Sequence, residues 1–215
     1  EVSGRTWLMR GKEADYPNHG WIKTKLDDEH INFLWDAISK KKDGLKNNLA
    51  GNISGSYSIE DKDHFFFNEV LYQHMEAYQQ LYGGHPVREY AYGDFKLQLG
   101  KFWVNYQNQH EFNPYHHHGG VYSFVVWMKI PTDWREQNKL QFLDGVKEED
   151  KKASIFEFEY TDILGNIRNY GYRLDPSYEG TMLFFPSSLR HCVYPYYECS
   201  EDRITVSGNI VYYSC

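Results

Sequence analysis

The chain has 215 residues, a formal net charge of −7, and 41% hydrophobic and 18% aromatic residues. This length and composition predict one folded domain with a sizeable core and exclude a disordered chain. The compact cationic run, Lys40 to Lys42, lies where a helix is expected to end, so it suits the helix dipole and does not indicate nucleic-acid binding.

Two amphipathic helices are expected in the N-terminal part. The first begins near Asp27 and carries apolar residues at helical spacing from Ile31 to Ile38. The second begins at Asp61 or Asp63 and ends at the Gly83-Gly84 pair. Both helices present one apolar face, which predicts that they pack against another layer of structure.

Strands are expected through most of the remaining chain. Short runs rich in aromatic and β-branched residues, separated by turn residues, predict strands at Phe95–Tyr106, Val121–Ile130, Ile155–Tyr160, Gly180–Pro186 and Arg203–Tyr213, and a short one near Trp21–Thr24. Polar stretches at Asn47–Tyr57, 133–138 and 144–152 are predicted as loops. The pattern predicts two helices outside a β-barrel or sandwich. We expect one domain, with a helical support region over residues 1–90 and a β core over residues 91–215.

Four histidines give the clearest chemical signal. His116, His117 and His118 are consecutive, and His191 follows the strand-like run that begins at Gly180. In an extended segment side chains alternate between faces, so His116 and His118 share one face while His117 points away. His191 can supply a third imidazole from a neighbouring strand. Imidazole suits iron, zinc, copper or nickel, so a metal centre is predicted, with a polar surface loop as the alternative.

Four segments in a fixed order resemble a known enzyme family. They are Trp103 to Asn105, Pro114 to His118, Gly180 to His191 and Arg203 to Asn209. The series resembles the 2-oxoglutarate- and iron(II)-dependent oxygenases of marine bacteria and their phages, relatives of the prolyl 4-hydroxylases. The resemblance implies a mainly β fold, a double-stranded β-helix or jelly roll with N-terminal supporting helices. It also implies Fe(II), 2-oxoglutarate as co-substrate and O2.

The resemblance assigns the metal-binding, and therefore catalytic, residues as His116, His118 and His191. The family commonly has a carboxylate at the middle position, where this chain has His118. We expect three histidines to bind the metal, while an acid such as Glu111, or a water molecule, remains an alternative third ligand.

The resemblance also assigns residues to the co-substrate. Arg203 matches the cation that pairs with the far carboxylate of 2-oxoglutarate, which a guanidinium binds bidentately. An ordinary ion pair with Glu201 or another acid is the alternative for Arg203. Two further candidates, Thr205 and Ser207, lie on the same strand face as Arg203 and are expected to donate hydrogen bonds from their hydroxyl groups. Two more, Asn105 and Asn209, are expected to contact the co-substrate or the residues around it.

The reaction implied by the resemblance is decarboxylation of 2-oxoglutarate to succinate and CO2, coupled to hydroxylation of a protein or peptide side chain or a small molecule. A cupin-type metal-dependent dioxygenase or isomerase is the alternative enzyme, since cupins use His-x-His plus a later histidine. However, the acid expected a few residues after His118 is absent, and a cupin has no particular use for Arg203. A non-catalytic metal-binding β-barrel module is the third alternative.

Cysteine content and hydropathy bear on location. Cys192, Cys199 and Cys215 form no Cys-x-x-Cys pair, which argues against a disulfide framework. No apolar stretch approaches the ~20 residues of a membrane span. We expect a cytoplasmic protein, in the host cytoplasm if it is phage-encoded, with neither nucleic acid nor membrane as a partner.

Overall fold

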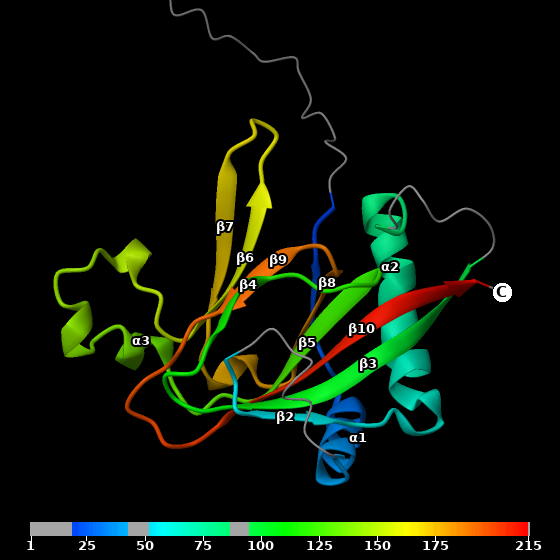
Figure 1. The fold of residues 1–215 in the computed structure, drawn as a ribbon, viewed down its shortest axis with the longest axis horizontal. Helices are drawn as coiled ribbons and strands as arrows, with labels where there is room; N and C mark the ends of the chain where they lie inside the picture. Colours follow the sequence, from blue (N-terminus) through cyan, green and yellow to red (C-terminus); the bar gives the residue numbers. More distant parts are fainter. Residues whose placement is uncertain (1–18, 43–51, 87–94, 215) are drawn as a thin grey trace, which may run out of the picture.

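The computed structural model describes residues 19–42, 52–86 and 95–214 (Figure 1). Within them, antiparallel strands form a six-stranded and a four-stranded sheet. In spatial order the larger sheet contains β1 (Ile22–Lys25), β8 (Thr181–Pro186), β5 (Tyr122–Lys129), β10 (Arg203–Ser214), β3 (Phe95–Gln107) and β2 (Gly55–Ser58). The smaller sheet contains β4 (Asn113–His116), β9 (Arg190–Val193), β6 (Ile155–Thr161) and β7 (Ile167–Arg173).

The two main helices cover the outer face of the six-stranded sheet (Figure 1). They are α1 (Asp28–Ser39) and α2 (Tyr72–Tyr82), and α2 continues from a π-helical turn at Phe67–Leu71. The carboxylate of Asp61 accepts hydrogen bonds from the backbone N–H groups of Phe66 and Phe67, so Asp61 satisfies donors at the start of this helical segment. A four-residue helix, α3 (Trp134–Gln137), and 3₁₀ turns at Lys62–His64, Gln141–Leu143, Glu148–Asp150 and Pro176–Tyr178 complete the helical structure of the described chain.

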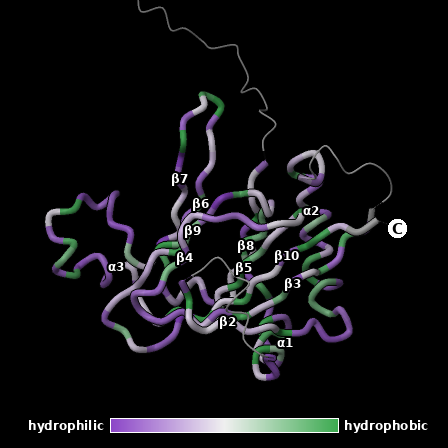
Figure 2. The backbone as a smooth tube through the Cα atoms, viewed as in Figure 1, coloured by the Kyte–Doolittle hydropathy of each residue, from purple (hydrophilic) through white to green (hydrophobic). Residues whose placement is uncertain are grey.

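Two hydrophobic clusters hold the layers together. One lies between the helices and the six-stranded sheet and includes Leu34, Met75 and Val206. The other lies between the two sheets and includes Trp127 and Phe158. In Figure 2, hydrophobic residues are frequent along the strands that pack against α1 and α2, whereas the loop that contains α3 is mostly hydrophilic. The central strands β5 and β10 therefore border a helical layer on one face and the second sheet on the other.

The structure confirms most of the predicted elements. Both helices, the five long strands and the short strand β1 lie where the sequence places them, and α2 stops before Gly83. The mainly β fold with helices outside is therefore confirmed. Among the described residues, no helix is long and apolar enough to cross a membrane.

Some predicted loops are wrong. The polar segment Asn47–Tyr57 contains part of β2, and 133–138 contains the short helix α3. The short strands β4, β7 and β9 had not been assigned as separate strands. Each is short or has mostly exposed residues, so hydrophobic periodicity does not reveal it.

Candidate metal centre

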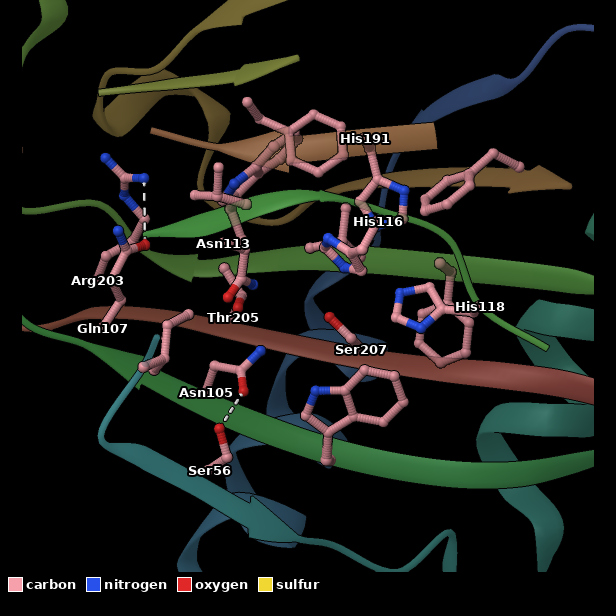
Figure 3. Close-up of a pocket in the computed structure, with 18 residues that line it drawn as sticks. Ser56, Asn105, Gln107, Asn113, His116, His118, His191, Arg203, Thr205 and Ser207 are labelled. Carbon is pink, nitrogen blue, oxygen red and sulfur yellow. Dashed lines mark hydrogen bonds between the residues drawn. The ribbon is translucent and has the colours of Figure 1, made fainter. Parts of the chain in front are cut away.

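A cavity between the two sheets collects most of the polar residues singled out from the sequence (Figure 3). It encloses about 730 Å³ of empty space, its open mouth included. The six-stranded sheet contributes Trp103, Asn105, Gln107, Arg203, Thr205 and Ser207, and the four-stranded sheet with its flanking loop contributes Asn113, His116, His118 and His191. None of the described residues that line the cavity is Asp or Glu.

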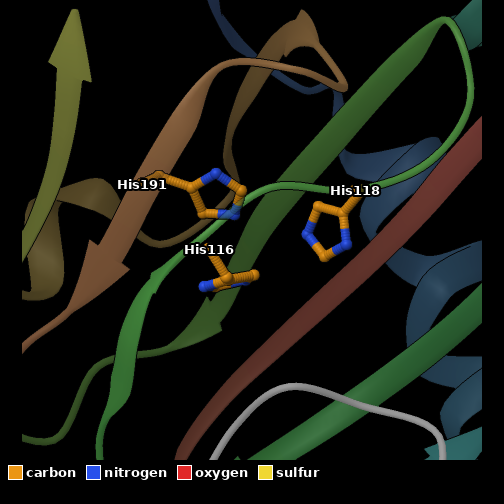
Figure 4. A group of neighbouring side chains, drawn as sticks. All are labelled: His116, His118 and His191. Carbon is orange, nitrogen blue, oxygen red and sulfur yellow. The ribbon is translucent and has the colours of Figure 1, made fainter.

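The three histidines meet at one end of this cavity (Figure 4). His116 on β4 and His191 on β9 are directly paired in the sheet, and His118 follows in the loop after β4. One nitrogen from each ring lies within 4.8 Å of the others. Bonds of about 2.1 Å to a shared ion would hold these nitrogens roughly 3.0–3.4 Å apart, so the rings would move closer together on binding. His117 is exposed, as strand alternation predicts.

Backbone carbonyls orient two of the rings. Nδ1 of His116 lies 2.7 Å from the carbonyl oxygen of Pro114, and Nδ1 of His191 lies 2.9 Å from that of Leu189. A carbonyl only accepts, so Nδ1 donates its proton and the Nε2 lone pair is left available. This arrangement is typical of metal-binding histidines, whose second nitrogen is usually held by an acceptor.

A bulge in β4 decides which side chains face the cavity. Asn113 pairs with Val193 and His116 pairs with His191, so three steps along β4 match two along β9. In regular strand alternation two residues three positions apart point to opposite faces. The extra residue in the bulge shifts the alternation of side chains by one position, so Asn113 and His116 both line the cavity.

The turn after β4 brings His118 back to the cavity. The backbone N–H of His118 donates to the carbonyl of Ser187, at 2.8 Å. Gly120 follows with φ of 117°, and a Cβ there would lie 2.7 Å from the carbonyl oxygen of Ile210. Glycine is therefore required for this turn to approach β10 so closely.

All three imidazoles are held neutral. Burial, reinforced by neighbouring histidines, lowers the pKa of His118 to about 4. The same causes lower the pKa of His116 and hold the pKa of His191 well below its ordinary value. Neutral imidazole is the form that binds a metal, so the set is ready for an ion at pH 7.

Arg203 lies at the other end of the cavity and is 1% exposed. Its guanidinium donates to Oγ of Ser154 at 2.6 Å and to Oε1 of Gln107 at 3.4 Å, and it lies 5.0 Å from the centre of the Tyr196 ring. Nε has no hydrogen-bond partner among the described residues. Glu201 pairs with Lys129 instead, at 2.6 Å, so the alternative of a Glu201–Arg203 ion pair is wrong.

The other predicted co-substrate residues divide between two places. Thr205 and Ser207 line the cavity on the same face of β10 as Arg203, and Asn105 lies beside Thr205 on the neighbouring strand β3 (Figure 3). The carboxamide oxygen of Asn105 accepts from the Ser56 hydroxyl at 2.7 Å, which turns its NH2 group away from Ser56.

Asn209 lies outside the group that lines the cavity. Its carboxamide oxygen accepts a hydrogen bond from the Ser123 hydroxyl at 2.9 Å, and Ser123 is bonded to Ser187. Because the Ser187 carbonyl holds the backbone of His118, Asn209 supports the loop of that histidine and does not reach the cavity itself.

Sequence reasoning missed several cavity residues. Asn113 and Gln107 were not singled out, and the aromatic rings of Trp103 and Phe185 also line the cavity. Oδ1 of Asn113 is buried and has no hydrogen-bond partner within the part of the chain that the structure describes. The only available signal was its position three residues before His116, which strand alternation alone assigns to the opposite face.

Glu111 is not near the histidines. Its two carboxylate oxygens accept hydrogen bonds from the backbone N–H groups of Ser54 and Asn108. Within the described chain, the candidate ligand group of His, Cys, Asp and Glu side chains here consists of the three histidines alone. Glu111 as a replacement ligand is therefore wrong.

The residues present fit an iron ion with an anionic chelating partner. Three neutral imidazoles are suitable donors for iron(II) and leave coordination positions open. The buried guanidinium, with one unpaired N–H and no acidic neighbour lining the cavity, is suited to a carboxylate. The three imidazoles and the guanidinium lie in the same cavity, at opposite ends (Figure 3).

Comparison with known proteins agrees with this chemistry. A family model described as "Putative 2OG-Fe(II) oxygenase" matches residues 101–209. No curated protein matches the chain. Among solved structures, a prolyl-4-hydroxylase from Pseudomonas putida has a TM-score of 0.48 and 16% identity, covering 88% of this chain and 91% of that one. An oxidoreductase of the 2OG-Fe(II) oxygenase family from Burkholderia pseudomallei has a TM-score of 0.53 and 8% identity, covering 89% of this chain and 84% of that one, and it shares the fold.

Proposed function

The chain belongs to the 2OG-Fe(II) oxygenase family, and from this premise we propose that His116, His118 and His191 hold Fe(II) while Arg203 binds the far carboxylate of 2-oxoglutarate. The observation that carries the proposal is the placement of three converging imidazoles and one buried, acid-free guanidinium in the same cavity. When bound, iron, 2-oxoglutarate and O2 supply an oxidative decarboxylation to succinate and CO2 that drives hydroxylation of a C–H bond.

The chain's own residues position the reactants. Arg203 orients the co-substrate by a charge-assisted, bidentate contact, and Thr205 and Ser207 offer hydroxyl groups beside it. Asn105 presents its NH2 group from the neighbouring strand β3. Trp103 and Phe185 supply apolar walls that limit water around the metal.

The substrate is proposed to be a protein or peptide side chain or a small molecule. A substrate has to enter through the open mouth of the cavity and reach the histidines. Because none of the described lining residues is acidic, the walls recognise a substrate by amide and hydroxyl hydrogen bonds and by apolar contact rather than by an ion pair with a carboxylate.

The deciding experiment is an anaerobic ultraviolet-visible titration of iron(II)-loaded protein with 2-oxoglutarate. We expect a weak visible charge-transfer band that is absent in His116→Ala and His191→Ala and requires more 2-oxoglutarate in Arg203→Ala. Asn166→Ala, in the exposed turn between β6 and β7, serves as the control and should titrate like the wild type. If the iron-loaded wild type gives no band, the co-substrate does not chelate the metal, and a cupin-like or non-catalytic barrel becomes the better description.

A further inference from the structure

A buried polar cluster lies on the outer face of the four-stranded sheet, behind the histidines. Tyr115 precedes His116 on β4, Cys192 follows His191 on β9, and Glu157 on β6 pairs directly with Cys192. These three side chains therefore form a row across three strands, on the face opposite the cavity. Glu157 is only 2% exposed, which is unusual for a carboxylate without a structural or functional partner.

Glu157 is the centre of this cluster. The hydroxyl of Tyr115 donates to Oε1 of Glu157 at 2.5 Å, and Lys152 forms an ion pair with Oε2. Asn169 on β7 donates to the Tyr115 hydroxyl at 2.6 Å and to Oε1 of Glu157 at 3.3 Å. The guanidinium of Arg190 lies 5.5 Å from the centre of the Tyr115 ring. The network therefore ties β4 to strands β6 and β7.

Among the described strands, β4 pairs with β9 alone. It lies at the edge of the four-stranded sheet, Pro114 has no N–H to donate, and the register to β9 is interrupted between Asn113 and His116. A bulged edge strand can slip in register, and a slip of one residue turns its side chains to the other face. The Tyr115–Glu157 hydrogen bond holds the bulge from outside the cavity.

We infer that Glu157 is a positioning residue of the metal centre, which acts through Tyr115 to hold the β4 bulge in the register that turns His116 and Asn113 into the cavity. Glu157 itself lies on the far side of the sheet and reaches the centre only through the backbone of β4. The role of His116 as a ligand rests on the proposed function, whereas the restraint on β4 does not.

The restraint is tested in metal-free protein by amide hydrogen exchange of the peptide that spans residues 113–118. Tyr115→Phe removes one hydroxyl, and we expect exchange there to become about tenfold faster, since a hydrogen bond to a carboxylate is stronger than average. Tyr170→Phe is the matched control: it also removes one hydroxyl from the four-stranded sheet, but Tyr170 is exposed on β7 and its ring contacts Trp21 and Tyr172, away from β4. Its exchange at 113–118 should equal that of the wild type.

The consequence for the centre is tested by titration with Co(II), followed by its visible spectrum. Because partners behind metal ligands commonly contribute 10- to 100-fold in affinity, we expect Tyr115→Phe and Glu157→Ala to bind Co(II) about tenfold more weakly. Their melting temperatures should stay within a few degrees of the wild type. Glu157→Gln keeps an oxygen that can accept from Tyr115, so it should bind Co(II) more tightly than Glu157→Ala. The double variant should be no weaker than Glu157→Ala.

The outcomes separate the inference from the proposed function. Wild-type exchange at 113–118 in Tyr115→Phe, or equally accelerated exchange in Tyr115→Phe and Tyr170→Phe, would overturn the positioning role. If the wild type does not bind Co(II), the proposed metal centre fails, and the exchange measurement alone still decides whether the Tyr115 hydroxyl restrains β4.

Discussion

Arg203 is a buried cation whose described partners are neutral. Burial lowers the pKa of this guanidinium from 12.5 to about 10, so it stays charged at pH 7. A shift of this size corresponds to about 3 kcal/mol of unfavourable free energy for the charged form. A ligand carboxylate, as we propose for 2-oxoglutarate, would relieve this cost.

Replacing Arg203 by methionine should therefore separate stability from binding. Arg203→Met keeps most of the side-chain volume and removes the buried charge, so the melting temperature of the ligand-free protein should be unchanged or higher. The rise in melting temperature that 2-oxoglutarate gives to anaerobic, iron-loaded wild type should disappear. Arg168→Met, which breaks an exposed ion pair with Asp162, should retain this rise. A full 2-oxoglutarate effect in Arg203→Met would contradict the assignment.

The histidine cluster makes the stability of the metal-free protein depend on pH. The folded-state pKa of His118, about 4, lies below its ordinary value of 6.5, so between these values the unfolded chain binds more protons. Stability is therefore fully present above about pH 6.5 and is lost as the pH falls toward 4. Urea unfolding at a series of pH values should show this loss, and His118→Asn should make it smaller. An equal slope in His118→Asn would show that other groups cause the loss.

At the level of single elements, β10 depends on a close approach at Gly208. A Cβ at this position would lie 2.7 Å from the ring of Phe124 and 3.0 Å from the carbonyl oxygen of Lys101. Gly208→Ala should therefore destabilise the protein by about 1–3 kcal/mol, as overpacked cores do. Gly119→Ala, where a Cβ would meet nothing within 4 Å, should change stability by less than about 0.5 kcal/mol. Denaturant unfolding measures both, and similar values for the two variants would contradict this account of the packing.

Sequence patterns predicted the elements with strong periodicity and missed those set by tertiary context. The long strands β3, β5 and β10 are rich in aromatic and branched residues, so their positions were clear. The short strand β9 gains its structure from its neighbours on the two sides. The convergence of His116, His118 and His191 followed from spacing and resemblance. Asn113 was missed because only the bulge, which depends on pairing with β9, turns it to the cavity.

At the scale of the whole molecule, the residues proposed to bind the metal and the co-substrate come from both sheets. His116 and His191 belong to the four-stranded sheet, and His118 to its flanking loop. Arg203 and its neighbours on β10 belong to the six-stranded sheet. A co-substrate that reaches from the metal to Arg203 therefore links the two sheets across the cavity.

Hydrogen exchange should detect this link. Co(II) alone should slow exchange mainly in β4 and β9, and Co(II) with 2-oxoglutarate should extend the protection to β10. In Arg203→Met the added co-substrate should leave the exchange of β10 unchanged. If Co(II) alone protects β10 as strongly as both ligands together, the link does not depend on the co-substrate.

The two environments of β10 constrain its sequence in different ways. Val206 and Ile210 pack under the helices, whereas Thr205 and Ser207 border the cavity. Substitutions at the first pair would lower the amount of folded protein, and substitutions at the second pair would alter ligand recognition in a protein that still folds. Because the two sets interleave, β10 can diverge at its cavity positions during evolution while the helix-facing positions keep the same scaffold.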